Sequence, residues 1–279
     1  MRIALRSVYT IAKKEFADNV RNKWILSLVA IFLVLAIASS FVAGLGRVGE
    51  MDATVGFLIT ISSMLVPIIS IMLGYATISG EAESGALSVV LACPIRRIEV
   101  LLGKLVGLGS VICLSIFVGF GISGILIAAS TGRAEWSGYI GFILLTMLLG
   151  MLYLSVSVCI SSILKRRVTS LGAGVIVFFW GAICGFIWIG LYAATGGNAG
   201  AFLAGETSDL PDWFWIEVFL SPQDGSGTAA MLAFGETEIL GYSVSLPSWV
   251  NLGTLVLAHL IWTLVPIALA YVWFQRRDV

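Results

Sequence analysis

The chain has 279 residues, of which 59% are hydrophobic and only 11% are charged. Soluble globular proteins carry about 25% charged residues, so this composition excludes a water-soluble globule, a disordered tail and a nucleic-acid-binding protein. Lys and Arg together number 16, as do Asp and Glu, so only the placement of the charges is informative. The cysteines stand singly in apolar sequence, which indicates small buried side chains rather than a disulfide framework or metal ligands; they are Cys93, Cys113, Cys159 and Cys184.

Several apolar stretches are long enough to span a membrane, which takes about 20 residues in a helix. Each is flanked by charged or turn-forming residues. We predict six spans and a retained first span, with these bounds: Trp24–Ala43, Thr54–Ile78, Lys104–Ala129, Trp136–Ile163, Thr169–Ala194 and Val250–Phe274.

The charged residues are sorted by side. Six crossings put both termini on one side, which then carries 14 basic and 6 acidic residues, against 2 basic and 10 acidic residues on the other. Lys and Arg are retained on the cytoplasmic side of membrane proteins. The sequence therefore predicts a multi-pass protein of the cell membrane with cytoplasmic N- and C-termini.

The segment before the first span has apolar residues at intervals of four, at Val8, Ala12, Phe16 and Val20. This spacing forms one stripe of a helix. We predict a helix over residues 1–23 that lies in the membrane interface with its basic side toward lipid phosphate; the alternative is an ordinary basic flank. The residues assigned to this interfacial helix are Lys13, Lys14, Glu15, Phe16 and Arg21.

The segment Ser79–Lys104 joins the second and third spans. Glu81 and Glu83 open a short apolar helix, where they complement the positive end of its dipole. Pro94 ends that helix because proline cannot continue the hydrogen-bond ladder, and a new long helix is predicted to begin near Glu99. Such a segment can receive force from another protein, or it can be a capped turn without a partner.

The same segment carries a resemblance to a family. Its pattern Gly80-Glu81-x-Glu83-x-Gly85-x-Leu87, followed by Pro94-x-x-Arg97 and Leu101-Leu-Gly103-Lys104, resembles the permeases of ABC-2 type transporters. The N-terminal run from Ala12 to Trp24 is similar to the basic first helix of that family. Within the family the chain is most similar to the NosY-like branch, which is linked to the maturation of nitrous oxide reductase.

The resemblance implies an all-α, polytopic permease fold of the ABC-2 (type V exporter-like) class, with six transmembrane helices and an N-terminal interfacial helix. It divides the chain into that helix (1–23), the transmembrane domain (24–274) and a short tail (275–279). A cytoplasmic coupling segment (79–99) would dock on an ATPase subunit. The resemblance places the coupling contacts at Glu81, Glu83, Gly85, Leu87, Pro94, Arg96 and Arg97.

The sequence has no GxxxxGK[ST] phosphate loop, the motif that holds ATP in such motors. We therefore expect the chain to be a permease without its own ATPase site and without a bound cofactor, ATP and Mg²⁺ being held by the partner subunit. A six-span permease forms half of a pathway wall, so a homodimer in the lipid bilayer is expected.

The segment Thr195–Trp249 lies on the outer side and contains seven acidic residues but no Lys or Arg. Asp209-Leu-Pro211-Asp212 predicts a helix start, and the aromatic residues after it favour a short helix that dips into the outer interface. The run Ser221–Gly227 is expected to break this helix, and Thr228–Phe234 to form a second piece. The acidity fits either an outer accessory protein or cationic substrate, or solvation alone.

Two polar residues within spans suggest a rival function. Gly121-Ile-Ser123-Gly124 fits the GxSG motif of rhomboid-type intramembrane serine proteases, and His259 is the only histidine. The alternatives are small-residue helix packing for Ser123 and either a hydrogen bond or a place on the substrate pathway for His259. The predicted function remains ATP-driven transport, as an exporter in metalloenzyme (copper or sulfur) maturation or as a general lipid, drug or polysaccharide exporter.

Overall fold

The computed structural model describes residues 4–21, 23, 27–28, 30–31, 33–34, 51–131, 136–200, 210–235, 238–239, 242–243 and 246–277. Within these ranges five apolar stretches are long enough to cross a membrane. They are formed by α3 (Met51–Gly74), α6 (Arg97–Thr131), α7 (Trp136–Ile163), α8 (Arg167–Ala194) and α12 (Leu252–Arg276). These helices agree with the last five predicted spans. Most of the predicted first span lies outside the described residues.

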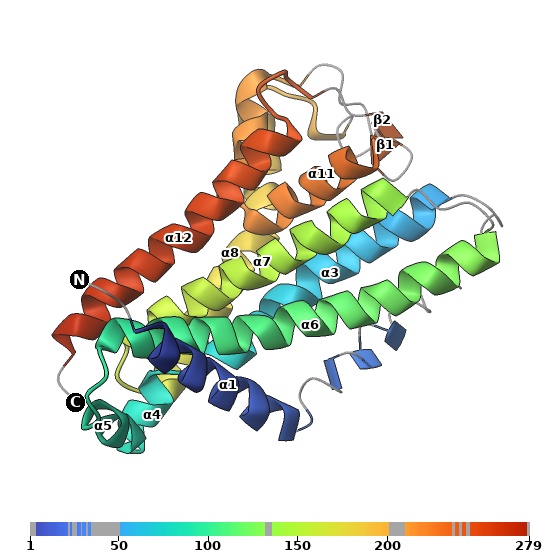
Figure 1. The fold of residues 1–279 in the computed structure, drawn as a ribbon. Helices are drawn as coiled ribbons and strands as arrows, with labels where there is room; N and C mark the ends of the chain where they lie inside the picture. The colour runs from blue at the N-terminus through green and yellow to red at the C-terminus, as the bar shows by residue number, and fades with distance from the viewer. Residues whose placement is uncertain are drawn as a thin grey trace.

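The shorter elements gather at the two ends of the bundle (Figure 1). One end holds α1 (Leu5–Arg21), α4 (Ser79–Glu83), α5 (Ala86–Leu91) and the C-terminus of α12. Every Lys and Arg that the structure describes lies at this end, which we call the basic end. The opposite end holds the 3-10 helix η1 (Asp212–Ile216), α10 (Glu217–Leu220), α11 (Pro222–Phe234) and the antiparallel strands β1 (Glu238–Ile239) and β2 (Tyr242–Ser243).

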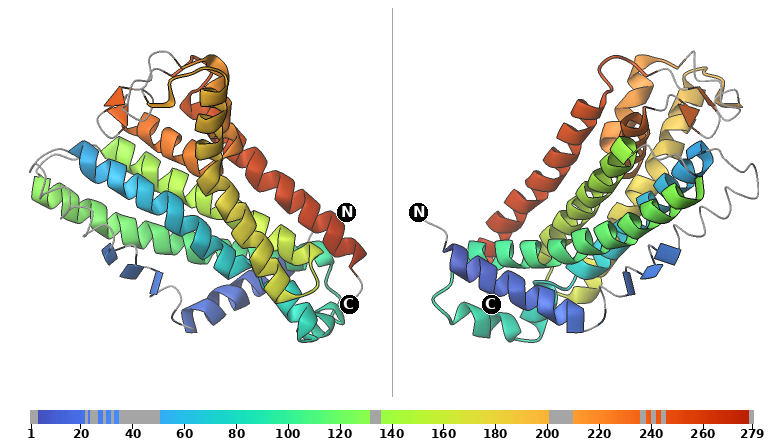
Figure 2. Two further views of the ribbon diagram at one scale, coloured as in Figure 1. Left: turned by 180° about the vertical axis from the view of Figure 1, so that it is seen from behind. Right: turned by 45° about the vertical axis from the view of Figure 1, so that its right-hand side comes forward.

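Helix α7 is the centre of the bundle and packs against α3, α6, α8, α11 and α12. Within its most apolar 18 residues 72% are buried, against 22% for α8 and α12. A helix that is apolar on all sides is suited to such a buried position. Helices α8 and α12 lie at the outside of the bundle (Figure 2) and expose several large apolar side chains, such as Phe186 and Leu264.

Helix α1 packs along the first turns of α6, and two glycines allow the close approach. A Cβ atom on Gly103 would lie 2.7 Å from the Cβ of Ile11, and one on Gly107 would lie 2.7 Å from the Cβ of Glu15. The predicted stripe of α1 faces α6, with Ala12 buried. The stripe therefore contacts protein as far as Phe16, whereas Val20 is 48% exposed. Lys13 and Lys14 on the other side of α1 are exposed.

Helices α10 and α11 form a hairpin that enters the bundle from the end opposite the basic end. The predicted break is confirmed at Ser221, which is extended after α10. It is shorter than predicted, because the second helix, α11, begins at Pro222 rather than at Thr228. Ser221 is its N-cap and accepts a hydrogen bond from the backbone N–H of Asp224, and Pro222 occupies the first turn, where a missing N–H costs nothing. The helix start predicted around Pro211 is confirmed, since η1 begins at Asp212.

Candidate functional site: the coupling segment and the re-entrant hairpin

The segment between the second and third predicted spans forms two short helices rather than one. Gly85 separates α4 from α5 with a φ of +76°, a left-handed conformation that glycine adopts without steric cost. Both acidic residues belong to α4, so the prediction that they open the apolar helix is wrong. Helix α5 ends at Leu91 before Pro94, and α6 begins at Arg97, two residues before the predicted start near Glu99.

An ionic cluster joins this segment to two other helices. The Nζ atom of Lys104, in the second turn of α6, lies 2.8 Å from Oε1 of Glu15 on α1 and 2.6 Å from Oε1 of Glu81 on α4. The Lys104 side chain is only 3% exposed. Two carboxylates from neighbouring helices therefore compensate its charge inside the protein. We call Glu15, Glu81 and Lys104 the ionic cluster.

Glu99 extends the connection to the start of α1. Its side chain is buried, and its carboxylate accepts hydrogen bonds from the backbone N–H groups of Ala4 at 2.9 Å and of Arg96 at 3.3 Å. Like Lys104, Glu99 does not reach the protein surface. A carboxylate at the first turn of a helix also complements the helix dipole, so Glu99 both begins α6 and holds the start of α1 against it.

Helix α7 holds α4 through a serine. The Oγ atom of Ser161 accepts hydrogen bonds from the backbone N–H groups of Ile78 and Ser79, both at 3.0 Å. These groups lie at the start of α4, where backbone donors lack partners within the helix. On the other side, Arg277 donates to the carbonyl oxygens of Ser161 and Ser162 at 2.9 and 3.0 Å. The end of α7 thus connects α4 with the end of α12.

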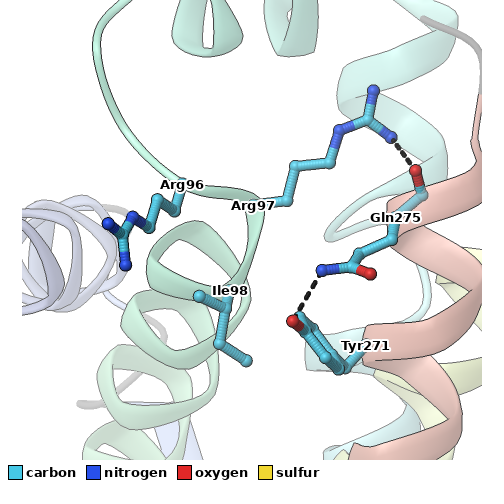
Figure 3. Close-up of a pocket in the computed structure, with 5 residues that line it drawn as sticks. All are labelled: Arg96, Arg97, Ile98, Tyr271 and Gln275. Atoms are coloured by element: carbon cyan, nitrogen blue, oxygen red, sulfur yellow. Dashed lines mark hydrogen bonds between the residues drawn. The ribbon is translucent and has the colours of Figure 1, made fainter. Parts of the chain in front are cut away.

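Arg97 fixes the beginning of α6 to the end of α12 (Figure 3). Its guanidinium donates to the carbonyl oxygens of Phe274, Gln275 and Arg277. These lie in the last turn and C-cap of α12, where carbonyl groups lack the usual partners further along the helix. Gln275 in turn donates to the Tyr271 hydroxyl at 2.6 Å. A shallow pocket between the two helices is lined by Arg96, Arg97, Ile98, Tyr271 and Gln275.

The predicted coupling residues divide into anchors and an exposed face. Leu87 is fully buried and anchors α5, as the ionic cluster and Arg97 anchor its neighbours. Pro94 and Arg96 are exposed, and Glu83 pairs with Arg167 at the surface, 3.9 Å apart. Sequence reasoning missed Val89, which is 72% exposed on α5. Because α5 is short and wholly apolar except for Ser88, its sequence does not indicate which of its side chains face outward.

The tip of the hairpin formed by α10 and α11 reaches far into the bundle. Ser221 donates from Oγ to the carbonyl of Gly181 at 3.0 Å, and Trp262 donates from Nε1 to the carbonyl of Phe219 at 2.9 Å. Gly181 lies 13 residues before the end of α8 at Ala194, which is about 20 Å along a helix. The hairpin is therefore re-entrant, as its aromatic and turn residues suggested, but deeper than the predicted interface.

His259 and Ser123 have separate partners. Nδ1 of His259 lies 2.8 Å from the carbonyl oxygen of Leu255, and Nε2 lies 3.0 Å from that of Pro222 at the hairpin tip. Ser123 donates from Oγ to the carbonyl of Gly119 at 2.7 Å. His259 thus binds the hairpin, and Ser123 makes the local bond typical of a small residue in a packed helix. Among the described residues, no three His, Cys, Asp or Glu side chains gather in a metal-binding group.

Comparison with known proteins agrees with this architecture. Residues 9–279 match the model of the ABC-2 family transporter protein. The chain is 30% identical over 284 residues to the probable ABC transporter permease protein NosY of Stutzerimonas stutzeri, covering 98% of this chain and 99% of the relative. It is 30% identical over 287 residues, with the same coverage, to the corresponding protein of Pseudomonas aeruginosa PAO1. The chain therefore belongs to the ABC-2 family of transporter permeases.

Proposed function

We propose that the chain is the membrane subunit of an ATP-driven exporter and that α4 and α5 transmit movement from a separate ATPase subunit. The ionic cluster carries this proposal, because one buried ammonium group joins α4 to α1 and α6. The exposed face of α5 and the loop after it, with Val89, Pro94 and Arg96, is the surface offered to the ATPase. The basic end then faces the cytoplasm, in agreement with the positive-inside rule.

The hydrogen bonds around the cluster define the path of the movement. A push on α5 moves α4, which is bound to α6 through Lys104 and to the end of α7 through Ser161. The start of α6 is bound to the end of α12 through Arg97. The long helices α6, α7 and α12 would thus move together when α5 is pushed. Alternating access between two openings requires such a joint movement. We expect a homodimer, with the outward apolar faces of α8 and α12 available for the second copy and for lipid.

We propose the substrate class from the similarity of the chain to NosY permeases. A role in metalloenzyme maturation, by moving a copper or sulfur species, is favoured by the 30% identity to NosY permeases over 98% of the chain. General export of a lipid, drug or polysaccharide is the alternative. Co-purification with an accessory protein that binds the acidic outer segment would favour the first; efflux of lipid or drug from vesicles by permease and ATPase alone would favour the second.

The coupling proposal is tested with the ATPase subunit co-expressed and the complex reconstituted in liposomes. Val89→Asp places a charge on the exposed face of α5 and is expected to abolish co-purification of the ATPase. Val89→Ile keeps the apolar surface and is the matched control. Charge reversal by Glu83→Arg or Arg97→Glu is expected to uncouple ATP hydrolysis from transport. Normal co-purification and coupled transport in all the charged variants would contradict the proposal.

A further inference from the structure

Two acidic side chains meet at the tip of the re-entrant hairpin. A Cβ atom placed on Gly185 of α8 would lie 3.6 Å from Oδ2 of Asp224 and 3.7 Å from Oε1 of Glu217. Both carboxyl groups therefore lie against the same position of α8. Glu217 is 7% exposed, whereas Asp224 is exposed. The pair is thus buried on one side and open on the other. We call Glu217 and Asp224 the carboxyl pair.

In the part of the chain that the structure describes, no Lys or Arg lies near the carboxyl pair. Residues 195–249 include no Lys or Arg, and every Lys and Arg in the described ranges lies at the basic end. His259 is the nearest basic side chain of α12, and its two ring nitrogens face backbone carbonyls rather than the carboxyl groups. The other titratable side chains near the pair are the Cys184 thiol of α8 and the Tyr153 phenol of α7.

Several buried polar atoms around the pair lack hydrogen-bond partners. One carboxyl oxygen of Glu217, the hydroxyl of Tyr153 and the side-chain nitrogen of Gln223 are unpartnered, and Tyr153 is fully buried. A Cβ atom on Gly181, one turn from Gly185, would lie 2.6 Å from the Tyr153 hydroxyl and 3.1 Å from Oε1 of Gln223. These side chains come from α7, α10 and α11 and converge on one glycine face of α8. Leaving such groups unpaired costs free energy, so their convergence points to a ligand.

The donor atoms define the chemistry of that ligand. The site offers two carboxyl groups, the Ser221 hydroxyl, which lies 2.6 Å from Oδ2 of Asp224, and the oxygens of Gln223 and Tyr153. Oxygen donors of this kind select hard cations such as Ca²⁺, whereas copper and zinc prefer nitrogen and sulfur. We propose that the carboxyl pair at the hairpin tip binds one hard divalent cation.

The proposal goes beyond coupling to an ATPase, because it concerns the half of the permease opposite the basic end. A cation there would bridge α10 and α11 and hold the hairpin tip against the glycine face of α8. Proton and cation compete for the same carboxyl oxygens. Cation affinity is therefore expected to fall as the pH decreases and the pair retains its proton.

The test uses the full-length chain in lipid nanodiscs, stripped of divalent ions, with Tb³⁺ as a luminescent probe for Ca²⁺ sites. Trp180 donates to the Leu220 carbonyl and Trp262 to the Phe219 carbonyl, so tryptophans lie close enough to sensitise bound Tb³⁺. We expect a saturable signal that Ca²⁺ displaces and that Glu217→Gln and Asp224→Asn each weaken at least about tenfold. Asp212→Asn, on the neighbouring η1, is the matched control and is expected to leave the signal unchanged.

A steric variant separates loss of the site from loss of folding. Gly185→Val keeps both carboxyl groups but fills the space between them, whereas Gly190→Val adds the same atoms on α8 where nothing lies within 4 Å of a new Cβ. We expect Gly185→Val alone to remove the Ca²⁺-displaceable signal. An unchanged signal in Gly185→Val or in folded Glu217→Gln, or equal loss in Asp212→Asn, would overturn the proposal. These outcomes do not depend on an ATPase, so they are distinct from a failure of the coupling proposal.

Discussion

The two ends of the permease treat buried charge in opposite ways. In the ionic cluster, the Lys104 ammonium group lies between two carboxylates from different helices, at 2.8 and 2.6 Å. In the carboxyl pair, Glu217 and Asp224 face each other with no Lys or Arg in residues 195–249. A charge with fixed partners joins helices firmly, whereas a carboxyl pair without a cation is suited to exchange a proton or a cation. Under the two proposals, the basic end transmits movement and the opposite end binds a cation.

The largest effect is expected from breaking the ionic cluster. Lys104→Met keeps the apolar stem but leaves Glu15 and Glu81 without their cation, which is expected to cost on the order of 3 kcal/mol of stability. The variant is expected to unfold at a clearly lower temperature in a detergent thermal-shift measurement and to lose stimulation of the partner ATPase. The matched control is Lys13→Met, because Lys13 is exposed on the side of α1 that faces away from α6. Equal stability of the two variants would contradict the role assigned to the cluster.

The next effect concerns the hairpin that holds the carboxyl pair. A Cβ atom on Gly225 would collide with the carbonyl oxygen of Val218, whereas one on Gly227 would lie 3.5 Å from Ile59 in ordinary contact. Gly225→Ala is expected to destabilise the protein by about 1–3 kcal/mol, as overpacking does, and Gly227→Ala to leave its stability nearly unchanged. Thermal unfolding followed by tryptophan fluorescence compares the two, and equal behaviour would show that the tip of the hairpin is not closely packed.

A third test measures how the thermal stability of the protein depends on pH, to which Glu217 of the carboxyl pair contributes. Burial, followed by the hydrogen bond to Asp224, raises the pKa of Glu217 to about 9 from its ordinary value of 4.5. The folded state therefore keeps a proton that the unfolded state loses, so this stabilisation is complete below about pH 4.5 and is lost as the pH rises to about 9. Glu217→Gln is expected to flatten the decline of unfolding temperature between pH 5 and 9. If the unfolding temperature of Glu217→Gln declined as steeply as that of the unmodified protein, the role assigned to Glu217 would be contradicted.

The smallest effect is expected at the turn between α4 and α5. Gly85 has a φ of +76°, and nothing lies within 4 Å of a Cβ placed on it, so Gly85→Ala meets only backbone strain. The expected cost is about 1 kcal/mol, and Gly85→Asn is expected to cost less because asparagine tolerates this conformation. Chemical denaturation in mild detergent measures both. A larger loss in Asn than in Ala would show that side-chain space, rather than φ, limits this turn.

The sequence predicted the elements that depend on local composition. Helix α7 has the predicted bounds, and the other four described spans differ from them by a few residues, because long apolar stretches are a strong signal for membrane helices. The stripe of α1 was also predictable from spacing, although its contact with α6 was not. Most of the predicted first span lies outside the described residues.

The features that sequence reasoning missed depend on distant contacts. Lys104 and Glu15 are separated by 89 residues, and nothing in either segment indicates that they meet. The start of α11 was misread because its glycines favour a loop, whereas tertiary contact requires one of them, Gly225, to lack a side chain. In the sequence, Glu217 and Asp224 are two of seven acidic residues in the outer segment, and nothing distinguishes them from the others. Only the fold shows that both lie against the same face of α8.

The most direct test of the account is photo-crosslinking from α5 in the co-expressed complex. A photoreactive residue at Val89, which is 72% exposed, is compared with one at Ile176, which is 71% exposed on the outward face of α8. The account predicts that the ATPase subunit, identified by its phosphate-loop peptide, crosslinks at position 89 alone and that ATP with vanadate changes the yield. Crosslinking of that subunit at position 176 with equal yield, or none at position 89, would contradict the account.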